Sequence, residues 1–239
     1  ATNFGSYVGV ESYRDPSAFF LSEHPSDALA ILERRRVRYV FAPATLVNLV
    51  GSMCRVAAPE LREAFLAAGP GGRTATTERW FGTLGARLLF GGTPFAPSGA
   101  CIGGDPNPLP YLRLVHVSPF RNHAVLEAVT GLPLPAAFVW ERVPGAQLVA
   151  HGVSGEDVQV EFDVVFPAVA PARTAYRLPW RARAKIDASG LVVLQVPYAT
   201  DARNGDATVQ NARWSIGTRS GKLTVPERAV RGGESVSLE

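Results

Sequence analysis

The hydrophobic period of the chain changes near Trp140. Before this residue, apolar side chains recur mostly at the spacing of an α-helix, whereas residues 157–164 (DVQVEFDV) alternate valine and phenylalanine with acidic and amide side chains. Strict alternation is typical of an antiparallel strand with one buried face. Further short apolar runs follow, separated by turn signals at residues 187–190 and 204–205. Several strands at this spacing predict a small antiparallel β-sandwich or barrel.

The earlier part of the chain predicts a mixed α/β core made mainly of helices. Residues 1–21 are rich in glycine and aromatic residues and have no period, so we expect a loop. Residues 22–36 predict a helix that Ser22 or Ser26 could cap. The remaining predicted elements are a strand over 37–42, helices over 44–56, 59–69 and 78–92, and a strand over 111–118.

Residues 139–152 (VWERVPGAQLVAHG) lie where the two patterns meet. They predict a strand, a tight Pro-Gly turn and a second strand. We therefore expect two units, an α/β central core over residues 1–137 and a β-rich peripheral unit over residues 138–239. The predicted fold class is α+β, a mixed α/β helical core followed by a small antiparallel β-sandwich or barrel.

Composition restricts the class of protein. The chain has 239 residues, of which 46% are hydrophobic and 19% charged, and this balance is typical of a globular protein. No apolar run approaches the roughly 18 residues that a membrane span needs. Only Lys185 and Lys222 among the 24 basic residues are lysine. Arginine suits phosphate or anionic lipid, but a biased codon pool explains the excess more simply, and no aromatic-lined basic groove indicates a nucleic acid partner.

The residues that usually carry chemistry form no recognisable site. Cys54 lies in an apolar run and predicts a buried thiol, although a bridge to Cys101 is open in an oxidising compartment. Ser154 lacks the glycine spacing of a nucleophile elbow and is expected in a hairpin loop. The four histidines have no metal-ligand spacing. The residues alone thus predict no catalytic or metal-binding group in this chain.

Several short motifs follow one another in a fixed order along the chain. In the β-rich part they are an aromatic-acidic strand with a VPGA turn (140–146), Arg173 and Tyr176, and a DxxG…VPY hairpin (187–198). In the first part they are residues 1–42, GARLLFGG (85–92) and YLRLVHVSP (111–119). In this order they resemble the extramembrane C-terminal region of prokaryotic oligosaccharyltransferase catalytic subunits, and the resemblance covers nearly the whole chain.

The resemblance implies a membrane enzyme of which this chain is one portion. Such an enzyme transfers an oligosaccharide from a polyprenyl diphosphate to the Asn of Asn-x-Ser/Thr, with Mn²⁺ or Mg²⁺. The family's Trp-Trp-Asp-Tyr-Gly signature is absent here, and we expect it shortly before Ala1. We therefore expect no catalytic residue and no metal in this chain, and no activity in isolation. The implied partners are the acceptor polypeptide and, through an N-terminal membrane domain, the lipid-linked oligosaccharide. The implied location is the extracytoplasmic, periplasmic face of the membrane, and the implied state is a monomer.

One site of the family can be carried over to this chain. The family has a helix after the YV strand whose Asp-x-x-Lys or Met-x-x-Ile motif lines the pocket for the acceptor's Ser or Thr. Leu46 and Leu49 occupy the two positions here, which resembles an apolar relative of the Met/Ile form. Two ordinary core leucines at this spacing are the alternative.

A different class of function also fits the residues. The chain could be a stand-alone module without catalysis that binds glycan or protein through exposed aromatic side chains of the β-rich part. Trp180 and Trp214 are the candidates for such a surface.

Overall fold

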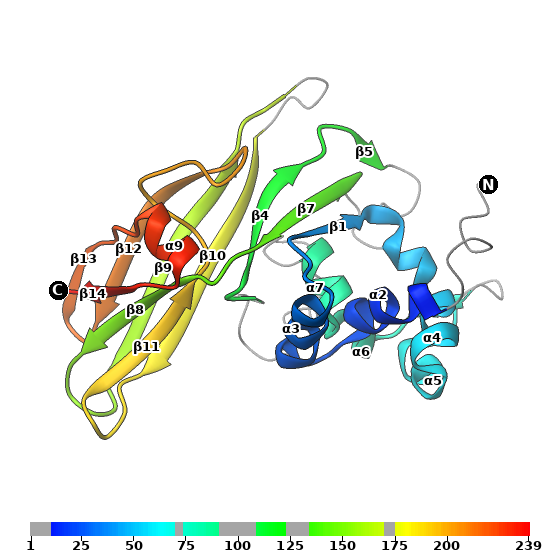
Figure 1. Ribbon diagram of the computed structural model, residues 1–239, viewed down its shortest axis with the longest axis horizontal. Helices are drawn as coiled ribbons and strands as arrows, with labels where there is room; N and C mark the ends of the chain where they lie inside the picture. Colours follow the sequence, from blue (N-terminus) through cyan, green and yellow to red (C-terminus); the bar gives the residue numbers. More distant parts are fainter. Residues whose placement is uncertain (1–10, 70–73, 91–108, 123–133, 170–174) are drawn as a thin grey trace.

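The computed structural model describes residues 11–69, 74–90, 109–122, 134–169 and 175–239. It has two halves (Figure 1). The helical half contains helices α2 to α7 and a three-stranded antiparallel sheet of order β1-β7-β4. The β half contains strands β8 to β14 and helix α9. The predicted α+β class is confirmed.

The helical half is built from short elements. Its helices are α2 (Glu11–Leu21), α3 (Pro25–Arg34), η1 (Ala44–Leu49, a 3₁₀ helix), α4 (Val50–Ala57), η2 (Pro59–Leu61, 3₁₀), α5 (Arg62–Phe65), α6 (Glu78–Phe81) and α7 (Leu84–Phe90). Its strands are β1 (Tyr39–Pro43), β4 (Leu112–Val117) and β7 (Ala137–Arg142), with the small pairs β2 (Leu66–Ala68) and β3 (Thr74–Thr76), and β5 (Arg121–Asn122) and β6 (Leu134–Pro135).

Several predicted helix boundaries are wrong. The loop expected over residues 1–21 is helical from Glu11, because Phe19 and Leu21 bury one face of α2 in the core. The 78–92 helix is broken, since the chain turns at Gly82 and the hydroxyl of Thr83 donates to the carbonyl of Trp80.

The helix expected over residues 59–69 also ends early. It stops at Phe65 and the chain continues as strand β2. Neither serine caps α3, whose N-cap is His24 and has no side-chain hydrogen bond. Pro25 opens the helix instead, at a position where its fixed φ suits the first turn.

The β half consists of two sheets. One has the order β10-β9-β12-β13 and the other β11-β8-β14. The strands are β8 (Ala146–His151), β9 (Asp157–Phe166), β10 (Tyr176–Lys185), β11 (Leu191–Val196), β12 (Thr208–Ile216), β13 (Arg219–Lys222) and β14 (Ser235–Leu238), and the helix is α9 (Glu227–Gly232). The predicted alternation of β9 is confirmed, because every second residue from Val158 to Phe166 is buried. Within the described ranges neither sheet closes into a barrel, and β14 runs parallel to β8 rather than antiparallel.

Strand β7 joins the two halves. The predicted strand–turn–strand of residues 139–152 is present, but β7 and β8 do not pair with each other. β7 lies between β1 and β4, where Phe138 and Trp140 enter the core, whereas β8 lies in a sheet of the β half. Gly145 makes the turn with φ +78° and donates its N–H to the carbonyl of Val230. The expected boundary at residue 138 therefore falls inside a central strand of the helical half, while the division into two units stays a prediction.

Candidate functional site

Leu46 and Leu49 lie on the 3₁₀ helix η1, directly after β1. Leu46 is 3% exposed and packs toward Gly85 of α7, whereas Leu49 is 46% exposed. Leu46 lies inside η1, whereas Leu49 is its last residue, directly before α4 begins at Val50. The structure therefore does not bring the predicted pair to one exposed face. Leu46 is a core residue and Leu49 is a surface residue.

A groove of about 630 Å³ runs beside η1 and α4. It is lined by Val47, Asn48, Gly51, Ser52, Arg55, Arg62, Leu66, Thr74, Ala75, Thr76 and Phe81, and neither Leu46 nor Leu49 is among these residues. Amide, hydroxyl and guanidinium groups on an otherwise apolar wall can hydrogen-bond an extended polypeptide. Asn48 and Ser52 were not predicted as site residues, although both lie in the helix predicted over residues 44–56.

Exposed apolar side chains also occur on β1, the strand that precedes η1 in the sequence. Tyr39 and Phe41 point away from the core because the strand alternates, and Leu49 follows at the end of η1. β1 is the edge strand of its sheet as far as the described residues show. Exposed large apolar groups along one segment are typical of a surface that contacts another molecule.

A buried group of charged and polar side chains, the junction cluster, connects the two halves. It consists of Arg113 on β4, Glu141 on β7, Asn204 in the loop before β12 and Glu227 on α9. Arg113 is 1% exposed. Its Nε and Nη2 donate to Glu141 Oε2 at 3.0 and 2.8 Å, and its Nη1 donates to Asn204 Oδ1 at 3.0 Å and to Glu227 Oε2 at 2.8 Å. All the charges of the cluster are thus paired and hydrogen-bonded.

The electrostatics of the cluster follow from burial and pairing. Burial disfavours the charged form of Glu141 and of Glu227, but hydrogen bonds and the positive charge of Arg113 hold the pKa of each carboxyl below its usual value. Burial likewise opposes the charge of Arg113, and the two carboxylates outweigh it, so the pKa of the guanidinium is raised. The cluster therefore stays fully ionised at neutral pH. Its only sequence signal was an arginine in the middle of an apolar strand.

The alternative of an exposed aromatic platform is wrong. Trp180 and Trp214 are only 4% and 6% exposed. Trp180 stacks on Phe162 with ring centroids 4.5 Å apart and planes 8° apart, and the ring of Trp214 covers Gly221. Both tryptophans occupy the inward-facing positions of their alternating strands, so they fill the core of the β half.

The remaining site predictions concern cysteine, metal and membrane. Cys54 is a buried free thiol, as predicted, and burial raises its pKa. Cys101 lies outside the described residues. Across the described ranges, no three His, Cys, Asp or Glu side chains come together in a way that could hold a metal ion. No helix in the same ranges is long and apolar enough to cross a bilayer.

The fold matches solved structures of an archaeal oligosaccharyltransferase. AglB from Archaeoglobus fulgidus, in complex with an inhibitory peptide and a dolichol-phosphate, matches 93% of this chain with a TM-score of 0.66 and 16% identity. The apo form of the Archaeoglobus fulgidus enzyme gives a TM-score of 0.68, and the form tethered to an acceptor peptide with the NVT sequon gives 0.64, both at the same identity and coverage.

The likeness shows the fold. It confirms the resemblance that the ordered motifs had predicted. The chain spans about a third of the length of these enzymes, 32% to 33% of each. No protein-family model matches the chain, and no curated protein matches it in sequence.

Proposed function

We propose that this chain is the extramembrane globular portion of a membrane oligosaccharyltransferase. The complete enzyme would transfer a lipid-diphosphate-linked oligosaccharide to the Asn of Asn-x-Ser/Thr sequons on the extracytoplasmic, periplasmic side of the membrane. The observation that carries the proposal is the fold likeness over 93% of the chain. The ordered motifs also support it, because they are features of the sequence alone.

In this proposal the chain supplies part of the surface that binds the acceptor polypeptide and supplies no catalytic residue. The related structures include a complex with an inhibitory peptide and a dolichol-phosphate, and a form tethered to an acceptor peptide with a sequon. We infer that the present protein likewise takes an acceptor polypeptide and a lipid-linked oligosaccharide, and acts as a monomer. We assign the Mn²⁺ or Mg²⁺ and the transfer step to the rest of the enzyme, as the family resemblance implies, and propose that the chain alone is inactive.

Leu49 is the residue of the predicted pair that can meet the acceptor. Its side chain is 46% exposed, whereas Leu46 is buried and packs in the core. If Leu49 contacts the methyl group of Thr in the sequon, one methyl in an apolar pocket contributes on the order of 1 kcal/mol. Thr sequons should then be preferred over Ser sequons several-fold.

The test uses the complete gene product, purified in detergent with its lipid-linked donor. Transfer to Asn-x-Thr and Asn-x-Ser peptides is measured for the wild type, for Leu49→Ala and for Val193→Ala, a control that shortens an equally exposed apolar side chain on β11. We expect Leu49→Ala to reduce the Thr/Ser ratio and Val193→Ala to leave it unchanged. A ratio unaffected by Leu49→Ala would reject the pocket role. If the complete protein, with its active site intact, transfers no oligosaccharide, the proposed transferase function is wrong.

A further inference from the structure

A second open cavity, the junction cleft, lies between the helical half and the β half. Its volume is about 760 Å³, within the range of small-molecule sites. Its charged lining residues come from the end of α3, the start of β1, the end of β7 and α9: Glu33, Arg36, Arg38, Glu141, Arg142 and Arg231. Four guanidinium groups against two carboxylates leave the lining with an excess of two positive charges.

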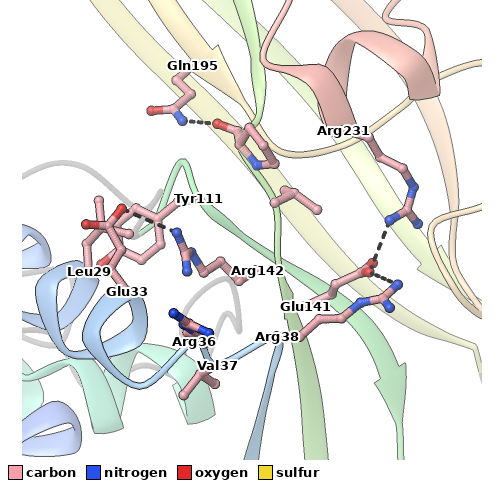
Figure 2. A pocket seen from close by; sticks show the side chains of 12 residues that line it. Leu29, Glu33, Arg36, Val37, Arg38, Tyr111, Glu141, Arg142, Gln195 and Arg231 are labelled. Carbon is pink, nitrogen blue, oxygen red and sulfur yellow. Dashed lines mark hydrogen bonds and ion pairs between the residues drawn. The ribbon is translucent and has the colours of Figure 1, made fainter.

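The arginines of the junction cleft keep donors available. Figure 2 shows Arg142 beside Glu33, and Arg38 and Arg231 on either side of Glu141. Each of these three ion pairs is a contact of 3.3 Å rather than a bidentate one, and a guanidinium carries five N–H donors. Glu141 also pairs with the buried Arg113, which Glu227 shares, and Glu227 pairs with Arg231 at 2.7 Å. Counting Arg113 and Glu227 as well leaves the same excess of two positive charges.

Arg36 has the fewest polar partners of the four cleft arginines within the described residues. Among the described residues it makes no ion pair, and its side chain is exposed at the cleft. Its backbone has φ +52°, the left-handed conformation that ends helix α3, where glycine or asparagine is favoured and arginine is strained. Neither the backbone nor an internal partner thus accounts for an arginine at this position. A ligand in the cleft would account for it.

We propose that the junction cleft binds a phosphate group as a dianion. Two negative charges match the excess of two guanidinium groups, and the planar fork of arginine fits phosphate oxygens. Leu29, Val37 and Val143 line the same cleft and give an apolar wall for the organic part of a phosphate ester. The phosphate could belong to a soluble ester or to a lipid headgroup. The site is additional to the acceptor surface and does not depend on the proposed transferase function.

The first test is calorimetry of the whole chain with inorganic phosphate and with glycerol 3-phosphate at low ionic strength. We compare the wild type with Arg36→Asn and with Arg183→Gln, a control that removes an exposed arginine from β10, outside the cleft. Arg36→Asn should weaken binding on the order of fivefold, because one charged donor is lost at an exposed site. It should also raise the melting temperature by about 2 °C, since asparagine suits a left-handed helix end. A loss of affinity together with a gain of stability cannot come from unfolding.

The control variant distinguishes phosphate binding in the junction cleft from nonspecific attraction to the positively charged protein. The control should bind both phosphates like the wild type. Absence of saturable binding to the wild type, or equal losses in the two variants, would overturn the proposal. Flotation with vesicles containing phosphatidic acid then identifies the source. Capture that depends on Arg36 indicates a lipid headgroup, and calorimetric binding without capture indicates a soluble ester.

Discussion

The junction cluster and the outer face of the β9–β10 pair use the same kinds of ion pair in opposite surroundings. In the cluster, Arg113 meets Glu141 at 2.8 Å with both side chains almost fully buried. On the outer face, Arg177 meets Asp163 at 2.7 Å with the guanidinium half exposed, and Lys185 meets Asp157 with both side chains at least 70% exposed. The Arg113 and Arg177 pairs have nearly equal distances, so distance does not distinguish these two pairs. Burial does, because a buried charge that loses its partner has no water to replace it.

Arg113→Ala is the test of this comparison with the largest expected effect on stability. The change leaves two carboxylates, Glu141 and Glu227, partly buried without their main partner. We expect a loss of about 3–5 kcal/mol in the free energy of unfolding, and a fall in melting temperature of roughly 10 °C. Denaturant unfolding followed by circular dichroism measures both. A loss below about 1 kcal/mol would mean that the cluster behaves like a surface pair.

A second prediction applies the same contrast between buried and exposed positions to apolar residues. Leu46→Ala removes a side chain that is 3% exposed and should cost about 2–5 kcal/mol, because a cavity remains in the core. Leu49→Ala, at 46% exposure, should change the free energy of unfolding by less than about 0.5 kcal/mol. Parallel melts of the two variants are the measurement. Equal losses would contradict the assignment of Leu49 to the surface.

Acid should weaken the junction cluster. The pKa values of Glu141 and Glu227 are lowered in the folded protein, against a usual value of 4.5. Their contribution to stability is therefore complete above about pH 4.5 and is lost as the pH falls through the folded pKa values. We expect Glu141→Gln to lower stability at pH 7 and to make its decline below pH 4.5 shallower than in the wild type. Parallel stability curves for the two proteins over this range would exclude the cluster as the cause.

The smallest effect is expected on the outer face. Arg177→Ala should cost no more than about 1 kcal/mol, and the difference from the wild type should shrink further at high salt. Urea unfolding at low and high sodium chloride concentration tests this. A cost comparable to that of Arg113→Ala would show that burial is not what separates the two groups of charges.

The sequence predicted the β half better than the helical half. In a strand of a sheet with one buried face, successive side chains point alternately to the core and to solvent, so the pattern is visible within the strand's own sequence. β9 follows this alternation over its whole length. The short helices depend on distant contacts. Nothing local in residues 11–21 indicated that Phe19 and Leu21 would be buried, and the break at Gly82-Thr83 interrupts a periodic run.

The candidate sites were predicted only in part. The helical segment with Leu46 and Leu49 was found through family resemblance, but the resemblance does not tell that Leu46 is buried and Leu49 exposed. The junction cluster could not be predicted, because the partners of Arg113 lie 28, 91 and 114 residues away in sequence. The tryptophans of β10 and β12 were misplaced since residue type alone does not tell which face of a strand is buried.

The position of α9 and β14 has a consequence for synthesis. Glu227 follows Arg113 by 114 residues, and β14, which pairs with β8, follows later still. At about 5–20 residues per second, roughly 6–23 s separate the appearance of Arg113 from that of its last partner. During this interval the helical half can form its sheet, but β8 has an open edge and Arg113 lacks one carboxylate. During synthesis a chaperone or another strand can thus pair with the open edge of β8. The edge is covered once residues 227–238 have folded as α9 and β14.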